Sequence, residues 1–244
     1  MQEEEVRLNK FVASCTELSR READRLIQEG EVSVNGSICT NPAVRVITGH
    51  DQVRLGRKAL HQRPPMVVAF HKPREVVCSR SDERNRKTIY NLLPHKFHHL
   101  KHVGRLDQDS EGLLILTNDG QLAQQITKPA TKLEKEYQVT IDQPFESELL
   151  LQLVKGVHTP EGQGKAKYAQ RISPRRISVV LESGFKRQVR LMLSTLGFRV
   201  TRLVRVRIGS LTLGELPLGK TELLDKLAIE HLLTNPEPRK NSPN

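Results

Sequence analysis

The sequence predicts an α+β fold, in which a small helix-helix-hairpin module precedes a larger domain with a mixed, largely antiparallel sheet flanked by helices. Short alternating apolar runs interleave with amphipathic helical runs along most of the chain. No glycine-rich nucleotide loop follows the first strand of the larger part, which argues against a doubly wound nucleotide-binding fold. The pair Pro64-Pro65 divides the chain, because consecutive prolines prevent a continuous helix or central strand.

The first module is expected to contain two helices and a hairpin. A helical pattern begins at Leu8, and Ser19 with Glu22 has the spacing of a capping box at the start of a second helix. An alternating strand follows and runs into Asn35-Gly36, the dipeptide that most strongly favours a tight hairpin turn. The pattern therefore predicts a compact unit that ends near Arg57.

The larger domain is expected to start with a buried strand at 66–70. Further strands are predicted at 113–117, 136–141, 177–182 and 200–208, and helices at 121–126, 146–154 and 186–196. The proline-rich and basic C-terminal segment predicts a disordered tail. The expected boundaries are a module at 1–60, a linker at 61–66, the larger domain at 67–232 and the tail at 233–244.

The charge balance favours a polyanionic partner. Lys and Arg total 39 against 28 Asp and Glu, which gives a net charge of +11 and a pI of about 9.8. Basic groups that bind phosphates release condensed counterions, so this surplus is typical of proteins that bind nucleic acids. The three widely spaced cysteines predict reduced thiols, and we find neither a targeting segment nor a long apolar run. We therefore expect a cytoplasmic protein that binds no membrane.

Three acidic residues at alternate positions, Asp107, Asp109 and Glu111, precede an apolar run. The residue types alone leave three interpretations open: a solvated loop, a divalent metal site of the kind used by nucleases, or one reactive carboxylate with two structural neighbours. An EF-hand calcium loop is excluded, because that loop has more oxygen ligands and a distal Glu at a fixed spacing.

The segment Gly104 to Gly120, GRLDQDSEGLLILTNDG, resembles the signature of the RsuA/RluB/RluE/RluF family of pseudouridine synthases. The stretch KEYQV from Lys135 resembles the family's Lys-x-Tyr-x-Val strand, and GFKRQVRLM from Gly184 resembles its Arg-Gln-Val-Arg-Arg-Met helix. The first module, with RLNKF from Arg7 and SRREA from Ser19, resembles an alpha-L RNA-binding domain. The resemblance extends from Val6 to about Leu224 and is greatest to the RluF type.

The resemblance implies that Asp107 is the catalytic carboxylate, acting either as nucleophile or as base. It also implies that Tyr137 stacks on the extruded base above Val189, and that Arg190 keeps the carboxylate ionised. Because pseudouridine is an isomer of uridine, we expect no cofactor and no metal. The four histidines between 95 and 102 are consequently not expected to bind one.

Basic residues outside this group are expected to bind RNA. Arg187 is placed by the same motif to contact phosphate or to share the role of Arg190, and Arg105 is placed to replace the extruded nucleotide or to bind phosphate. Alternation in the strand at 200–208 predicts that Arg205 and Arg207 present their guanidinium groups on one exposed side. The small module is expected to contribute Lys10, Arg20, Arg21 and Arg25.

We expect a monomer. The family resemblance implies action on a uridine of bacterial large-subunit (23S) ribosomal RNA, free or in pre-ribosomal particles. A transfer-RNA anticodon uridine is a possible second target, and small-subunit ribosomal RNA is the alternative substrate. A different class of function is a non-catalytic RNA-binding or ribosome-assembly factor on a synthase fold. One motif departs from the family: Lys72-Pro73-Arg74-Glu75 has Glu where relatives have Gly, which predicts a different turn.

Overall fold

The computed structural model describes residues 4–237 and separates the chain into two compact units. The first comprises Met1–Pro65 with Lys96–Leu100, and the second comprises Met66–His95 with Lys101–Asn244. The main boundary falls after Pro65, within the predicted linker. No helix among the described residues is long and apolar enough to cross a membrane.

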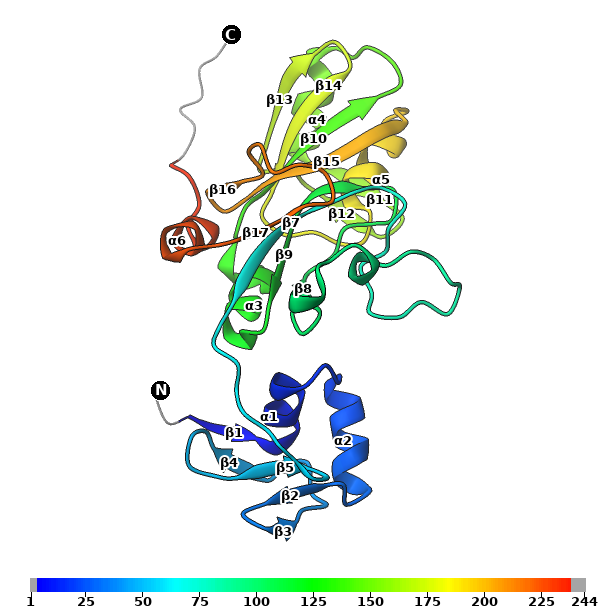
Figure 1. Ribbon diagram of the computed structural model, residues 1–244. Coiled ribbons are helices and arrows are strands. Elements are labelled where there is room, and N and C mark those ends of the chain that lie inside the picture. The colour runs from blue at the N-terminus through cyan, green and yellow to red at the C-terminus, as the bar shows by residue number, and fades with distance from the viewer. Residues whose placement is uncertain (1–3, 238–244) are drawn as a thin grey trace. The chain divides into compact units, whose positions relative to one another are not determined.

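The N-terminal unit has the helix-helix-hairpin order that the sequence predicts (Figure 1). The capping box of Ser19 and Glu22 starts the second helix, and Asn35 and Gly36 have φ angles of 51° and 86°, as a tight hairpin turn requires. The elements are β1 (Glu5–Arg7), α1 (Leu8–Cys15), α2 (Arg20–Gln28), β2 (Val32–Val34), β3 (Ser37–Ile38), β4 (Arg45–Ile47), β5 (Val53–Leu55) and β6 (Lys58–Ala59). The strands form two sheets, with the orders β1-β4 and β3-β2-β5-β6.

The larger unit is built on a nine-stranded sheet in the order β13-β14-β10-β15-β9-β7-β17, with β16 paired to β15 and β8 to β9 (Figure 1). Only β15 and β9 run parallel among the strand pairs of this sheet in the described residues. The predicted α+β class with a largely antiparallel sheet is therefore confirmed. The strands are β7 (Val67–Lys72), β8 (Lys101–Val103), β9 (Glu111–Thr117), β10 (Lys135–Ile141), β11 (Val157–Thr159), β12 (Gly162–Gly164), β13 (Tyr168–Ser173), β14 (Arg176–Leu181), β15 (Val200–Ile208), β16 (Leu211–Thr212) and β17 (Thr221–Leu223).

Helices pack on this sheet and enclose two apolar cores. One core includes Val139 of β10 and Met192 of the helix Gln188–Thr195, and the other includes Ile115 of β9 and Leu122 of the helix Gly120–Thr127. Burial of these side chains is the main source of stability, at roughly 25 cal/mol per Å² of apolar surface. The helices are α3 (Gly120–Thr127), α4 (Ser147–Lys155), α5 (Gln188–Thr195) and α6 (Lys226–Leu233), with 3-10 turns at Ile89–Asn91, His95–Phe97 and Pro129–Thr131.

Most predicted element bounds differ from the observed ones by one or two residues, and two of the differences have an identifiable cause. The helix expected from Lys186 begins at Gln188, because Arg187 adopts a left-handed conformation with φ of 59°. The segment expected to be disordered from residue 233 is folded at its start: Leu233 ends α6, and the Asn235 side chain bonds the backbone of Glu134 and Lys132 at 2.8 and 3.1 Å. Residues 238–244 of that predicted tail lie outside the described residues.

Candidate active site

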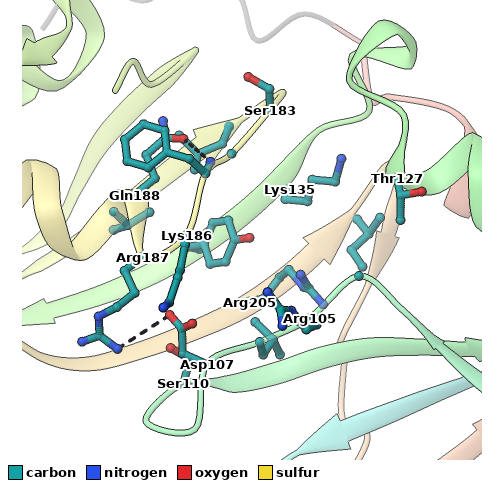
Figure 2. Close-up of a pocket in the computed structure, with 18 of the residues that line it drawn as sticks. Arg105, Asp107, Ser110, Thr127, Lys135, Ser183, Lys186, Arg187, Gln188 and Arg205 are labelled. Atoms are coloured by element: carbon teal, nitrogen blue, oxygen red, sulfur yellow. Dashed lines mark hydrogen bonds and ion pairs between the residues drawn. The ribbon is translucent and has the colours of Figure 1, made fainter. Parts of the chain in front are cut away.

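Asp107 lies in the wall of a cavity of about 350 Å³ in the larger unit (Figure 2). The cavity opens between the two apolar cores, because Val189 and Leu203 belong to one and Val103 and Ile208 to the other, and all four line it. The loop between β8 and β9 carries Asp107, whose side chain keeps 31% of its surface exposed. The carboxylate is therefore accessible to a ligand while the loop beneath it is held rigidly.

The loop is held from below by Lys72, the fully buried last residue of β7. Its Nζ donates hydrogen bonds to the carbonyl oxygens of Pro73, Asp107 and Ser110 at 3.0, 3.0 and 2.8 Å. Burial lowers the pKa of the Lys72 ammonium group. All three ammonium protons are satisfied by backbone carbonyls, so Lys72 fixes the conformation of the loop that carries the carboxylate.

Glu75, the residue at which this chain departs from the family motif, lies in a strained backbone conformation. It has a φ of 66°, the left-handed conformation that favours glycine, and its backbone N–H donates to the Gln108 carbonyl at 2.8 Å. A side chain at such a φ costs roughly 1–2 kcal/mol relative to glycine. That the turn differs from the turn of the relatives stays a prediction.

Among residues 4–237, Arg187 provides the guanidinium group that forms an ion pair with the Asp107 carboxylate. Its Nη1 lies 3.9 Å from Oδ2 of Asp107 (Figure 2). Its two terminal nitrogens also donate to both Asp109 oxygens at 3.2 and 3.1 Å. Burial opposes the charge on Asp109, but the hydrogen bonds from Arg187 and the nearby Arg190 outweigh it and lower the pKa of Asp109. The same hydrogen bonds raise the pKa of Arg187.

Arg190 contacts the loop and not the Asp107 carboxylate directly. Its Nη2 donates to the Asp109 carbonyl at 2.9 Å and to Ser110 Oγ at 3.3 Å, and Nε lies 3.4 Å from Oδ2 of Asp109. The side chain is only 11% exposed, and burial lowers its pKa. The resemblance assigned the charge-holding role to Arg190, whereas the structure places Arg187 closer and gives Arg190 a role in holding the loop.

Tyr137 and Val189 line the same cavity from two different elements. Tyr137 is half-buried on β10, and Val189 is buried in the first turn of α5. Arg105 is exposed at the cavity edge, two residues before Asp107. The structure therefore brings together Arg105, Asp107, Tyr137, Arg187 and Val189.

The three acids of the loop do not converge. Glu111 is only 4% exposed and accepts a hydrogen bond from Arg202 at 2.6 Å, whereas Asp109 pairs with Arg187. Within residues 4–237, no group of three or more His, Cys, Asp or Glu side chains is arranged to hold a metal ion. These contacts disfavour the metal-site interpretation of Asp107, Asp109 and Glu111.

The prediction that Arg205 and Arg207 share one exposed side is wrong. Tyr137 pairs with Arg205 and Glu136 with Arg207, so Val206 is left as an extra residue at a register shift between them. Because of this shift, Arg205 lines the Asp107 cavity, whereas Arg207 lies on the other face of the sheet. There Arg207 pairs with Glu134 and Glu136 at 3.0 and 2.8 Å. Both arginines are buried, so Arg207 has no exposed guanidinium for RNA.

In the small unit, the predicted RNA-binding residues lie on two helices. Arg20, Arg21 and Arg25 are exposed on α2, and Lys10 is half-buried on α1. Arg25 pairs with Glu29 at 3.0 Å, and Lys10 pairs with Glu4 at 3.5 Å. Exposed pairs of this kind contribute little to stability, so these basic groups remain available to phosphates.

Sequence reasoning missed Lys72 and Lys135. Lys72 belongs to the Lys-Pro-Arg-Glu stretch that departs from the family motif, but nothing in the sequence indicated that its ammonium group would be buried under the loop that carries Asp107. Lys135 lies two residues before Tyr137 on the same strand, and that spacing alone places both side chains on one face of the sheet. Both line or support the Asp107 cavity.

Family models match both units. The model described as RNA pseudouridylate synthase matches residues 66–195, and the S4 domain model matches residues 6–53. A solved structure described as a crystal structure of a pseudouridylate synthase has a TM-score of 0.68 at 30% identity, covering 93% of this chain and 99% of that one.

Three relatives illustrate the range of similar proteins. Ribosomal large subunit pseudouridine synthase B of Bacillus subtilis is 32% identical over 97% of this chain and 99% of the relative. Ribosomal small subunit pseudouridine synthase A of Salmonella typhimurium is 34% identical over 86% and 92%. Dual-specificity RNA pseudouridine synthase RluF of Salmonella typhi is 34% identical over 88% and 74%, so identity does not single out the RluF type. The chain belongs to the RsuA/RluB/RluE/RluF family of RNA pseudouridine synthases and has an N-terminal S4 domain.

Proposed function

We propose that this protein converts a uridine of large-subunit ribosomal RNA to pseudouridine, with Asp107 as the catalytic carboxylate. The observation that carries the proposal is the position of Asp107: it is accessible in a cavity, with Arg187 at 3.9 Å and Tyr137 in the same wall. Two of the relatives are named for ribosomal substrates, and the large-subunit enzyme matches over the greater share of this chain, 97% against 86%. A transfer-RNA anticodon uridine is the second candidate, because one relative is named as dual-specificity.

The chemistry fits these side chains. Isomerisation breaks the bond between N1 of the base and C1′ of ribose, turns the base, and joins C5 to C1′. Asp107 either attacks C1′ or removes a proton from the ribose, and the Arg187 guanidinium stabilises the carboxylate before and after that step. Tyr137 stacks on the base after it has left the RNA helix, since an enzyme that acts on a base must first extract it. Val189 packs beside Tyr137 in the pocket.

RNA is bound mainly through its backbone. The exposed arginines of α2, with Lys10 of α1, offer cations to phosphates from the S4 domain, and Arg105 and Arg187 do so at the cavity. We place the protein in the cytoplasm as a monomer, where ribosomal RNA and pre-ribosomal particles are available.

The proposal is tested by mapping pseudouridine on unmodified RNA. Purified protein is incubated with large-subunit RNA, small-subunit RNA or transfer RNA in the presence of a chelator, and pseudouridine is located by carbodiimide adducts and primer extension. We expect a new adduct at a defined uridine of the large-subunit RNA. An adduct confined to small-subunit RNA would correct the substrate, and binding without any adduct would favour an assembly factor.

A further inference from the structure

Arg205 is a buried cation that the proposed chemistry has not used. Its side chain lines the Asp107 cavity although the residue is only 5% exposed. Nε donates to the Leu113 carbonyl at 2.7 Å, but Nη2 is buried without a hydrogen-bond partner among residues 4–237. An unmet donor on a buried charged group is costly, so it calls for an explanation, and a role in catalysis is one of them.

The backbone holds Arg205 beside the residue expected to stack on the base. Arg205 of β15 lies directly opposite Tyr137 of β10, so both side chains project from the same face of the sheet. On its other side it pairs with Gly112 of β9, where an added Cβ would lie 2.3 Å from the Arg205 carbonyl oxygen. The position of Arg205 is therefore set by a β-bulge on one side and by an obligatory glycine on the other.

Lys135 adds a second cation at the same place (Figure 2). It precedes Tyr137 by two residues on β10 and lines the cavity with Arg205. Burial and the neighbouring Arg205 lower the pKa of Lys135 to about 8. No carboxylate within residues 4–237 forms an ion pair with Lys135 or with Arg205. The two cations therefore lie near each other at the cavity without an acidic partner among these residues.

We propose that Arg205 and Lys135 form a cationic pair that binds the carbonyl oxygens of the target uracil and stabilises the negative charge it gains when its bond to ribose breaks. The inference rests on the proposed function. Phosphate is the other group of the substrate to which cations bind strongly. The burial of Arg205 beside Tyr137 favours the base, because phosphates of a bound strand lie toward solvent, where Arg105 and Arg187 are exposed.

The electrons balance without a co-reactant. When the N1–C1′ bond breaks, its electron pair goes to N1 and is shared with the O2 and O4 carbonyls. This holds whether Asp107 has attacked C1′ or has removed a ribose proton. The base turns and C5 supplies the pair for the new C5–C1′ bond, while Asp107 either leaves C1′ or returns the ribose proton. C5 then loses a proton and N1 gains one. The charge to be stabilised exists only between bond breaking and bond making, which is where a preorganised cationic site accelerates a reaction most.

The test separates rate from affinity. Single-turnover conversion at saturating enzyme, and RNA affinity, are measured for Lys135→Gln, Arg205→Gln and Arg205→Lys. Arg199→Gln serves as a control that removes the same charge from a side chain 79% exposed. We expect both Gln variants to lose about 100-fold in rate and Arg205→Lys to lose less, with affinity no weaker than in the control. Thermal melts verify that each variant is folded. If Arg205→Gln does not fold, the rate of Lys135→Gln alone tests the inference.

A fluorinated substrate tests the charge directly. In RNA with 5-fluorouridine at the target, fluorine withdraws electrons and stabilises the departing base, so its consumption should depend less on the cationic pair. We expect the ratio of wild-type to Lys135→Gln rates to shrink at least about fivefold on this RNA. An equal ratio on both substrates, or weakened affinity with an unchanged saturating rate, would overturn the inference. Wild-type conversion of the unmodified RNA tests the proposed function separately.

Discussion

The guanidinium group of Arg187 bridges Asp107 and Asp109: it lies 3.9 Å from the first carboxylate and donates two hydrogen bonds to the second. A left-handed backbone at Arg187, immediately before α5, directs the side chain to this point. Asp109 therefore holds the Arg187 guanidinium close to Asp107, the carboxylate that we propose performs the reaction. The two acids have different roles although they lie two residues apart.

Replacing Arg187 with Gln should lower the single-turnover rate of pseudouridine formation by about 10- to 100-fold, because Asp107 loses the cation paired with it. Arg187→Lys should recover only part of the rate, since an ammonium cannot make the paired hydrogen bonds to Asp109. Rates are measured at saturating enzyme. Arg176→Gln, on the opposite face of the sheet, is the charge-matched control. Wild-type rates for both Arg187 variants would show that Arg187 serves only to bind RNA.

Replacing Glu75 with Gly should raise the free energy of unfolding by about 0.5 to 1 kcal/mol. The change removes the strain of a side chain at a φ of 66°, and the greater freedom of Gly in the unfolded chain offsets part of the gain. Urea titration measures the difference. Glu83→Gly in the neighbouring exposed loop relieves no positive φ and should not stabilise the protein. A loss of stability in Glu75→Gly would show that the side chain contributes contacts of its own.

Replacing Gly112 with Ala should destabilise the protein by about 3 kcal/mol or more and abolish conversion. The new Cβ would lie 2.3 Å from the Arg205 carbonyl oxygen, and the φ of 115° is unfavourable for any side chain. The strands β9 and β15 would have to separate, which displaces Arg205. Gly120→Ala, at the start of α3 with no atom near the added Cβ, is the control and should leave stability almost unchanged. Unfolding is followed by circular dichroism.

The rate should fall as pH rises through about 8, because the pKa of Lys135 is lowered to about 8 and its charge is lost above that pH. Arg stays protonated there, so Lys135→Arg should remove this fall. Single-turnover rates between about pH 7 and pH 9 measure it. An unchanged pH profile in Lys135→Arg would assign the titration to another group. The other charged side chains lining the cavity are Arg105, Asp107, Glu182, Lys186, Arg187 and Arg205.

Local patterns predicted the elements that depend on local chemistry. The Ser19 and Glu22 spacing marked the start of α2, and the alternation from Val200 to Ile208 gave the bounds of β15 correctly. The resemblance around Gly104 to Gly120 indicated the loop that faces the cavity. These features are encoded within a few residues of one another, which is why a single sequence reveals them.

Features that depend on distant residues were not predictable. The bulge at Val206 forms only where β15 pairs with β10, so simple alternation placed Arg205 and Arg207 on the same side. The side chain of Arg187, which follows a left-handed backbone, is held by Asp109, a residue 78 positions away in the chain. The docking of Asn235 against Glu134 likewise joins residues 101 apart and made the predicted tail too long.

The most direct test of the account replaces Asp107 with Asn, which keeps the shape of the side chain and removes its charge. Pseudouridine formation on ribosomal RNA and RNA affinity are measured on the same preparation. We predict no detectable pseudouridine and an affinity within about threefold of the wild type, because we expect RNA to bind mainly to the basic residues of the S4 domain and the cavity edge. Conversion at the wild-type rate would show that Asp107 is not the catalytic carboxylate.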